Sequence, residues 1–156
     1  MIIISIQSFL DSSKMLYDSN KYIEALCLAC IAVDACALKC YPNKKKSSER
    51  YKLFLKENFR DICELGFPGI IASNIKIKIN IPNVNLKPDK NKYVNMEQII
   101  YHILRCGLVH QCEIDKTVEF TDSTEIGDWN DKFYIPKAII LGLISVAEKN
   151  QGGDKK

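Results

Sequence analysis

The amino-acid sequence predicts a mainly α-helical fold with a small inserted antiparallel β-hairpin or sheet. Apolar residues recur at helical spacing through residues 21–40, a segment that ends just before Pro42. The isoleucines of residues 75–81 alternate with polar residues, as in a strand with one face in water. A last apolar segment, 136–149, begins with Pro136, which suits the first turn of a helix.

Five helices are expected, and capping and breaking residues set their ends. The first, 4–18, is separated from the second, 21–40, by the polar run Asp18-Ser19-Asn20. The third covers Ser47–Phe59. The fourth opens at Asn95-x-x-Gln98, which resembles a capping box, and runs to about Gln111. The fifth is 136–149.

Three strands are expected between and after these helices. They cover 75–81, 116–121 and a short stretch at Tyr134 and Ile135. Pro82 and Pro88 mark a loop after the first strand. An isolated two-stranded hairpin is only marginally stable in water, so the strands must pack on the helices or on a partner.

Length and composition predict one globular domain over residues 1–150, with the β region inserted at about 70–121 and a disordered tail at 151–156. The chain has 156 residues, of which 47% are hydrophobic and 26% charged, and this excludes a largely disordered or fibrous chain. The longest apolar window, Ala138–Ala147, is too short to span a membrane. Residues 1–4 are too short for the core of a signal peptide. A cytoplasmic protein without a membrane partner is expected.

The charge is unevenly distributed. The net charge is +3, but residues 39–60 hold eight Lys or Arg against two acids, and residues 113–131 hold seven acids against one lysine. The basic stretch can meet a phosphate backbone, which makes Arg50 and Lys52 candidate substrate-binding residues. The alternative is an ordinary solvated loop and helix face.

The seven cysteines indicate a reduced protein without a metal site. Their odd number argues against a closed disulfide framework, and four of them share the segment 21–40, where bridges within one helix are geometrically poor. Cys27-x-x-Cys30 is similar to half of a zinc or redox site, but no matched second pair follows at finger-like spacing. No metal and no cofactor are expected.

The chemistry-bearing motif is Arg105-Cys106-Gly107-Leu108-Val109-His110, near the end of the fourth predicted helix. With Tyr101-His-Ile-Leu before it and two long helices upstream, the motif resembles that of HEPN domains, over about residues 4–60 and 95–148. Many active members have a tyrosine two residues after the histidine, where this chain has Cys112.

The resemblance implies an up-and-down helical bundle that acts as a metal-independent endoribonuclease. It implies a homodimer through the fourth helix, where close approach of a second copy would explain Gly107, and RNA or a nucleotide as ligand. A role in toxin–antitoxin systems or antiphage defence is also implied, with a cognate antitoxin as a further partner. The alternatives are a non-catalytic HEPN-like module that binds RNA, a nucleotide or a protein, and a plain helical interaction protein.

The residue types of the motif suit RNA cleavage. A separation of five residues is about 140° of arc on an ideal helix, but arginine is long enough for both groups to share one groove. Histidine can take up or release a proton near neutral pH, and the planar guanidinium matches phosphate oxygens. His110 and Arg105 are therefore candidate catalytic residues. In the alternative, Arg105 pairs an acid and His110 is hydrogen-bonded inside the bundle.

Two further polar residues fall near the motif or on an apolar stripe. Asp34 lies on the stripe formed by Ile23, Cys27, Cys30 and Leu38, which is expected to face inward. A carboxylate there is costly unless paired, so Asp34 is expected to pair with Arg105 or His110, or with their copies in a second subunit. The HEPN resemblance implies that an acid on the second helix supports the active pair, which makes Asp34 a third candidate catalytic residue. The alternative is that Asp34 pairs with a backbone end or a lysine. His102, one turn before Arg105, either binds substrate or is simply half-buried. Trp129, Phe133 and Tyr134 either stack on bases or anchor the last loop.

Overall fold

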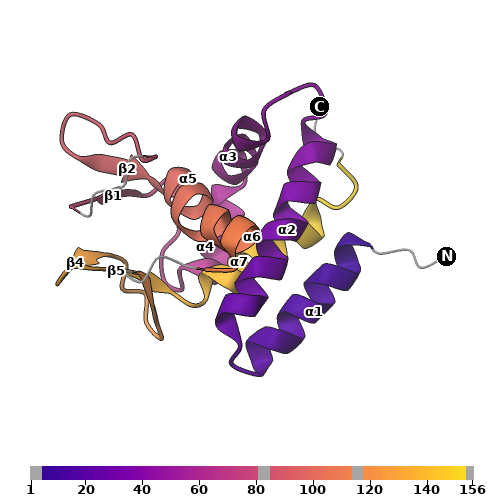
Figure 1. Cartoon of the computed structure of the whole chain (residues 1–156), viewed down its shortest axis with the longest axis horizontal. Coiled ribbons are helices and arrows are strands. Elements are labelled where there is room, and N and C mark those ends of the chain that lie inside the picture. The colour runs from indigo at the N-terminus through magenta and orange to yellow at the C-terminus, as the bar shows by residue number, and fades with distance from the viewer. Residues whose placement is uncertain (1–4, 81–84, 114–117, 154–156) are drawn as a thin grey trace.

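A computed structural model of the chain describes residues 5–80, 85–113 and 118–153. It is mainly helical and carries two small sheets (Figure 1). The helices are α1 (Ile6–Asp18), α2 (Tyr22–Cys40), α3 (Ser47–Glu57), α4 (Phe59–Gly66), α5 (Met96–Ile99), η1 (Ile100–Arg105), α6 (Cys106–Gln111) and α7 (Ile139–Lys149). The strands are β1 (Lys76–Lys78), β2 (Tyr93–Asn95), β3 (Val118–Thr121), β4 (Gly127–Trp129) and β5 (Lys132–Pro136).

Helix α2 forms the centre of the helical part. It packs against α1, α3, α6 and α7, and its small buried residues let those neighbours come close. The turn between α1 and α2 places Asn20 at φ 61°, a left-handed conformation that asparagine tolerates. The buried hydroxyl of Ser13 donates to the carbonyl of Ala25 at 2.7 Å and so joins the two helices near this turn.

The face that α2 buries differs from the sequence expectation. Ile23 and Leu38 are 46% and 50% exposed, so the expected inward stripe is wrong at both of its ends. The buried side instead consists of small and medium residues: Ala25, Leu26, Ala29, Cys30, Ala32, Val33, Cys36 and Ala37. Because α2 is apolar nearly all round, its sequence periodicity does not select the buried face.

The third predicted helix, Ser47–Phe59, is present as α3, which ends at Glu57, and a further helix follows it. Asn58 stands between α3 and α4, with φ −109°, and its buried side chain donates to the carbonyl of Phe54 at 2.8 Å. An asparagine side chain that donates to a helix carbonyl competes with the backbone hydrogen bonds of the helix, which favours the end of the helix at this point. The chain then continues as α4 to Gly66, which the sequence analysis did not predict.

Residues 96–111 form one continuous helical segment with a change of winding in its middle. Helix η1 is a π-helix, in which the N–H of Cys106 donates to the carbonyl of Tyr101, five residues before it. Segments of π-helix are rare and occur often at functional sites. The segment ends at Cys112, which adopts a left-handed conformation (φ 55°) and donates its N–H to the carbonyls of Gly107 and Leu108.

The strands make two separate sheets on the side of the molecule away from α1 (Figure 1). Strands β1 and β2 are antiparallel, with Ile77 opposite Val94. In the second sheet, of order β3-β5-β4, β4 and β5 are antiparallel but β3 and β5 are parallel. The expectation of an antiparallel arrangement is therefore wrong for β3–β5.

The boundaries of the strands also differ from the prediction. The described strand in 75–81 is only Lys76–Lys78, and β2 and β4 were not predicted. Both missed strands have three residues, too few for alternation to be visible.

Some predicted elements lie partly outside the described residues, which leave out 1–4, 81–84, 114–117 and 154–156. These elements are the first helix, two strands and the tail. Among the described helices, none is both long and apolar enough to cross a bilayer.

Helices α4 and α7 cross at two glycines. A Cβ on Gly142 would lie 2.4 Å from the carbonyl oxygen of Ile62 and 3.0 Å from the Cα of Gly66. A contact as short as 2.4 Å essentially never occurs for real Cβ atoms, so the crossing requires a residue without a side chain at Gly142.

We predict that Gly142→Ala lowers the free energy of unfolding by about 1–3 kcal/mol, because the added methyl group forces α4 and α7 apart. Alanine alone would favour the helix by about 1 kcal/mol, so a net loss measures the close approach. Urea denaturation provides the measurement. Lys149→Ala, at the exposed end of α7, is the control and should stay within about 0.5 kcal/mol. A variant as stable as the wild type would contradict the close crossing.

Candidate functional site

The predicted residues Asp34 and Arg105 form an ion pair between α2 and the end of η1. Nη2 of Arg105 donates to Oδ2 of Asp34 at 2.8 Å. The side chain of Arg105 is only 7% exposed, and that of Asp34 is 32% exposed. The expectation that Asp34 pairs with Arg105 or His110 is thus confirmed for Arg105.

Two aromatic rings lie against the guanidinium. Its carbon Cζ lies 5.1 Å from the ring centroid of Tyr101 and 5.7 Å from that of Tyr51, and the two rings are 5.3 Å apart. Burial by itself lowers the pKa of Arg105, but the hydrogen bond and the charge of Asp34 offset burial and raise it above its ordinary value. Arg105 is therefore a fixed cation, held by one carboxylate and two ring faces.

Sequence reasoning missed both tyrosines as site residues. Tyr101 lies four residues before Arg105, and this spacing on a helix was the available signal. Tyr51 was assigned only to the apolar side of its helix. It comes from α3 and is fully buried, with its hydroxyl donating to the carbonyl of Cys30 at 3.4 Å. Nothing local to Tyr51 in the sequence links it to Arg105.

His110 lies on the solvent side of the same guanidinium. Nη1 of Arg105 is 3.5 Å from Nε2 of His110, and the imidazole is exposed. Because a guanidinium has no acceptor, this contact is a hydrogen bond only while Nε2 carries no proton. The structure thus brings the two motif residues together at the end of α6, and His110 is not enclosed within the bundle.

Two of the three predicted substrate-binding residues adjoin this centre through Tyr101. The His102 ring meets the Tyr101 ring edge-on at 4.9 Å, and Nζ of Lys52 lies 5.7 Å from the Tyr101 centroid. Burial lowers the pKa of His102, and the charges of Lys52 and Lys87 lower it further. His102 therefore favours its neutral form at neutral pH.

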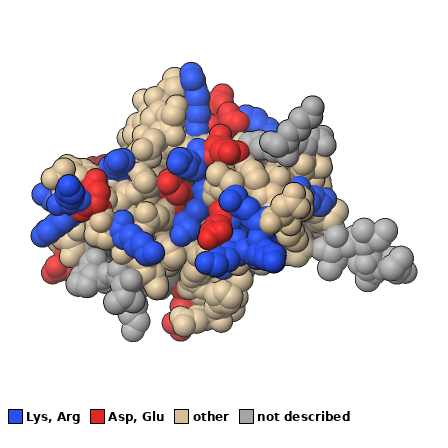
Figure 2. Space-filling model, turned by 90° about the horizontal axis from the view of Figure 1, so that it is seen from above, with Lys and Arg blue, Asp and Glu red and all other residues tan. Residues whose placement is uncertain are grey.

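The third, Arg50, supports a loop instead. Its Nη1 donates to the carbonyl oxygens of Lys44 and Lys45, at 2.8 and 3.2 Å. These bonds hold the turn that leads into α3, whose neighbouring lysines are exposed. Figure 2 shows Lys and Arg side chains spread over one face of the molecule, with acidic side chains among them.

The aromatic residues near the chain's last strands form a separate group. The Trp129 and Tyr134 rings stack with centroids 4.2 Å apart and an interplanar angle of 14°. Trp129 is 38% exposed, whereas Phe133 is buried in the core. Phe133 therefore anchors its strand in the core, and Trp129 is the more accessible aromatic residue.

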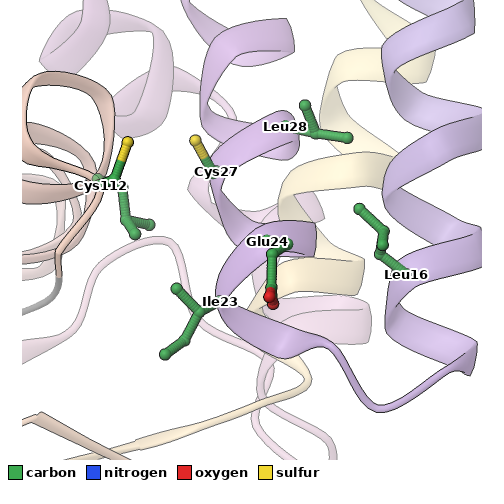
Figure 3. A pocket seen from close by; sticks show the side chains of 7 residues that line it. Leu16, Ile23, Glu24, Cys27, Leu28 and Cys112 are labelled. Carbon is green, nitrogen blue, oxygen red and sulfur yellow. The ribbon is translucent and has the colours of Figure 1, made fainter.

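An apolar groove lies between α2 and α6, with α1 at its far side (Figure 3). It has a volume of about 260 Å³. Its lining consists of Leu16, Ile23, Glu24, Cys27, Leu28, Leu108 and Cys112. The two cysteines stand on opposite walls of this groove.

The described residues hold no group of three or more His, Cys, Asp or Glu that could bind a metal ion. All seven cysteines lie within the described ranges, and none of them forms a disulfide there.

Comparison with known proteins gave one match. The model of a family described as Rv1289 matches residues 5–152 of the chain. The searches of curated proteins and of solved structures gave no match.

We predict that Asp34 and Arg105 are energetically coupled. Asp34→Ala leaves a buried cation without its partner and should lower the free energy of unfolding by about 1–3 kcal/mol. In a double-mutant cycle with Arg105→Met, the coupling energy should be about 0.5–3 kcal/mol. The exposed pair Glu119–Lys132, with N–O distance 2.9 Å, is the control and should couple by less than about 1 kcal/mol. Equal coupling in the two pairs would contradict a special role for burial.

We predict that Lys52→Gln raises the pKa of His102, because it removes a positive charge that disfavours the imidazolium. Proton NMR titration measures this directly, since the chain has only two histidines and His110→Gln assigns the other. Lys90→Gln, at an exposed lysine, is the control.

The lowered pKa of His102 in the wild-type protein has a consequence for stability. The folded protein binds this proton less tightly than the unfolded chain does, so the contribution of His102 to stability is lost as pH falls below about 6.5.

A His102 titration that does not respond to Lys52→Gln would show that the lysine does not face the ring.

Proposed function

The chain belongs to the Rv1289 family, and we propose that it is a metal-independent endoribonuclease of the HEPN type. The observation that carries the proposal is the 3.5 Å approach of Nη1 of Arg105 to Nε2 of the exposed His110. A fixed cation beside an accessible imidazole is the minimum that RNA cleavage by its own 2′-hydroxyl requires.

In this proposal His110 is the general base. When a phosphate oxygen takes the place of Nε2 on Nη1 of Arg105, the Nε2 lone pair is released. Nε2 then takes the proton from a ribose 2′-hydroxyl, whose oxygen attacks the adjacent phosphorus. The bond to the 5′-oxygen breaks, and that oxygen leaves with a proton from a general acid. The products are a 2′,3′-cyclic phosphate and a 5′-hydroxyl. The proton supplied to the leaving oxygen comes from water or from a histidine of a second copy.

Arg105 acts through the one nitrogen that faces His110. Nη2 is used by Asp34, and the side chain is 7% exposed, so a phosphate oxygen can reach only the Nη1 edge. Charge that develops on the phosphoryl oxygens there is stabilised by a cation that needs no reorientation. Asp34 is then a positioning residue, since it holds the guanidinium and does not meet the substrate.

The charge around the centre supports RNA as the ligand. Lys52 lies on the Tyr101 ring next to the guanidinium, and Lys44 and Lys45 precede α3 on the same helix–loop unit. The proposal retains Lys52 and His102 as substrate-binding residues and removes Arg50, which is engaged by the loop. It also retains a homodimer through residues 96–111, a cytoplasmic location, and a cognate antitoxin in toxin–antitoxin or antiphage defence.

A non-catalytic HEPN-like module that binds RNA, a nucleotide or a protein is the second candidate. The burial of Arg105 favours it, because the ion pair with Asp34 and the contacts with two rings give this arginine a role in stabilising the fold without any catalysis. The presence of Cys112 at the position of the usual tyrosine points the same way.

We predict that the purified protein cleaves single-stranded RNA in excess EDTA, and that His110→Ala lowers the rate by about 10²–10⁴-fold, because the general base is lost. The cleavage products, read by gel and mass spectrometry, should carry cyclic phosphates. Gln111→Ala, the exposed neighbour on α6, is the matched control and should cleave at the wild-type rate.

Three outcomes separate the candidates. Equal cleavage by wild type and His110→Ala would identify a contaminating nuclease and end the proposal. Binding without cleavage, measured by fluorescence anisotropy with labelled RNA, would establish the second candidate. Circular dichroism confirms that each variant is folded, so that a lost activity is not a lost fold.

A further inference from the structure

Two thiols from different helices face one another across the apolar groove. Cys27 lies on α2, and Cys112 is the residue that closes α6. In Figure 3 the Cys27 side chain projects from α2 on the side where α6 carries Cys112. Because α2 packs directly on α6, the pair is held at a contact between two helices.

The pair differs from the other cysteines in access. Cys30, Cys36, Cys40 and Cys63 are buried in the core. Cys106 is half-buried, with its sulfur 4.0 Å from Nη1 of Arg105. Cys112 is exposed and Cys27 is half-buried. A small oxidant can therefore reach Cys112 first and meet Cys27 beside it.

The surroundings of the two sulfur atoms differ, and this difference determines which one reacts first with an oxidant. Burial raises the pKa of Cys27, and the nearby Cys112 thiol raises it further. Cys27 thus keeps its proton more firmly than an ordinary thiol, and the exposed Cys112 is the sulfur that reacts with an oxidant. A less accessible thiol next to a reactive one is the arrangement in which the second thiol resolves the oxidised first.

We propose that Cys27 and Cys112 form a site of reversible oxidation, at which hydrogen peroxide converts the two thiols into a disulfide between α2 and the end of α6. The Cys112 thiolate attacks one peroxide oxygen and releases hydroxide, which gives a sulfenic acid. The Cys27 sulfur then attacks the Cys112 sulfur and releases water. In total, two thiols and one peroxide give one disulfide and two waters, and a dithiol reductant restores the thiols.

The bridge requires the Cα atoms of Cys27 and Cys112 to come within about 4.4–6.8 Å of each other. Cys112 lies at the end of α6 in a left-handed conformation, so an adjustment there turns the last residue and leaves the helix intact.

The bridge would change two features at once. It would fasten the end of α6, two residues beyond His110, to α2, and it would lie across the groove that both cysteines line. The inference does not rest on the ribonuclease proposal, because its evidence is the position of the thiols.

The test is peptide mapping after oxidation. Folded wild-type protein is treated with a small excess of hydrogen peroxide, free thiols are blocked by alkylation, and the protease digest is analysed without reduction. We expect a disulfide-linked pair of peptides carrying Cys27 and Cys112, lost on treatment with dithiothreitol. Cys112→Ser should lose the linked pair, and Cys106→Ser, which removes another thiol of α6, should keep it.

An independent measurement uses phenylarsine oxide, a trivalent arsenical that bridges two adjacent thiols without oxidation. The wild type should bind one equivalent by intact mass, and Cys27→Ala and Cys112→Ser should each lose it. Independent alkylation of both thiols after peroxide, or a Cys112–Cys112 link between two chains, would overturn the proposal. These outcomes are read from masses, so they are separate from any result on RNA cleavage.

Discussion

The structure is organised around one buried positive charge. The Arg105 guanidinium is almost entirely removed from water, and taking a charge out of water is costly unless it is compensated. The compensation comes from three separate segments: Asp34 on α2, Tyr51 on α3 and Tyr101 within η1. The charge can be buried only when these segments are correctly placed, so it couples the position of the 96–111 helix to the rest of the bundle.

One continuous helical segment presents several groups to this charge. In its π turn the N–H of Cys106 donates to the carbonyl of Tyr101, five residues before it. Arg105 lies four residues after Tyr101, a spacing that puts both side chains on one face, and its guanidinium lies over the Tyr101 ring. The ordinary α-helix that follows carries His110 to the outer side of the same guanidinium. The inner side of Arg105 therefore serves the fold, and its outer edge is the part left for chemistry.

The end of α6 combines this centre with the apolar groove. His110 and Cys112 are two residues apart, yet one faces the guanidinium and the other the groove between α2 and α6. Any contact or bond that moves this helix end acts on both. A reactive group and a regulatory group can thus share one short segment while they lie against different surfaces.

The sequence by itself determined the mainly helical class, most helix positions and the grouping of Asp34, Arg105 and His110 as candidates. Capping residues, prolines and apolar spacing are local signals, and they suffice for these features. The pairing of Asp34 with an arginine also followed, because an acid on an apolar helix needs a partner.

Only the tertiary structure decided which face of α2 is buried, which strands pair in parallel and which rings enclose Arg105. Helix α2 is apolar nearly all round, so the choice between its alanine face and the Ile23–Leu38 face depends on how closely α1 and α7 can approach. The partnership of Tyr51 with Arg105 joins residues 54 positions apart, and no local pattern encodes such a contact. Short-range signals fix the winding of a segment, whereas its neighbours fix what each side chain touches.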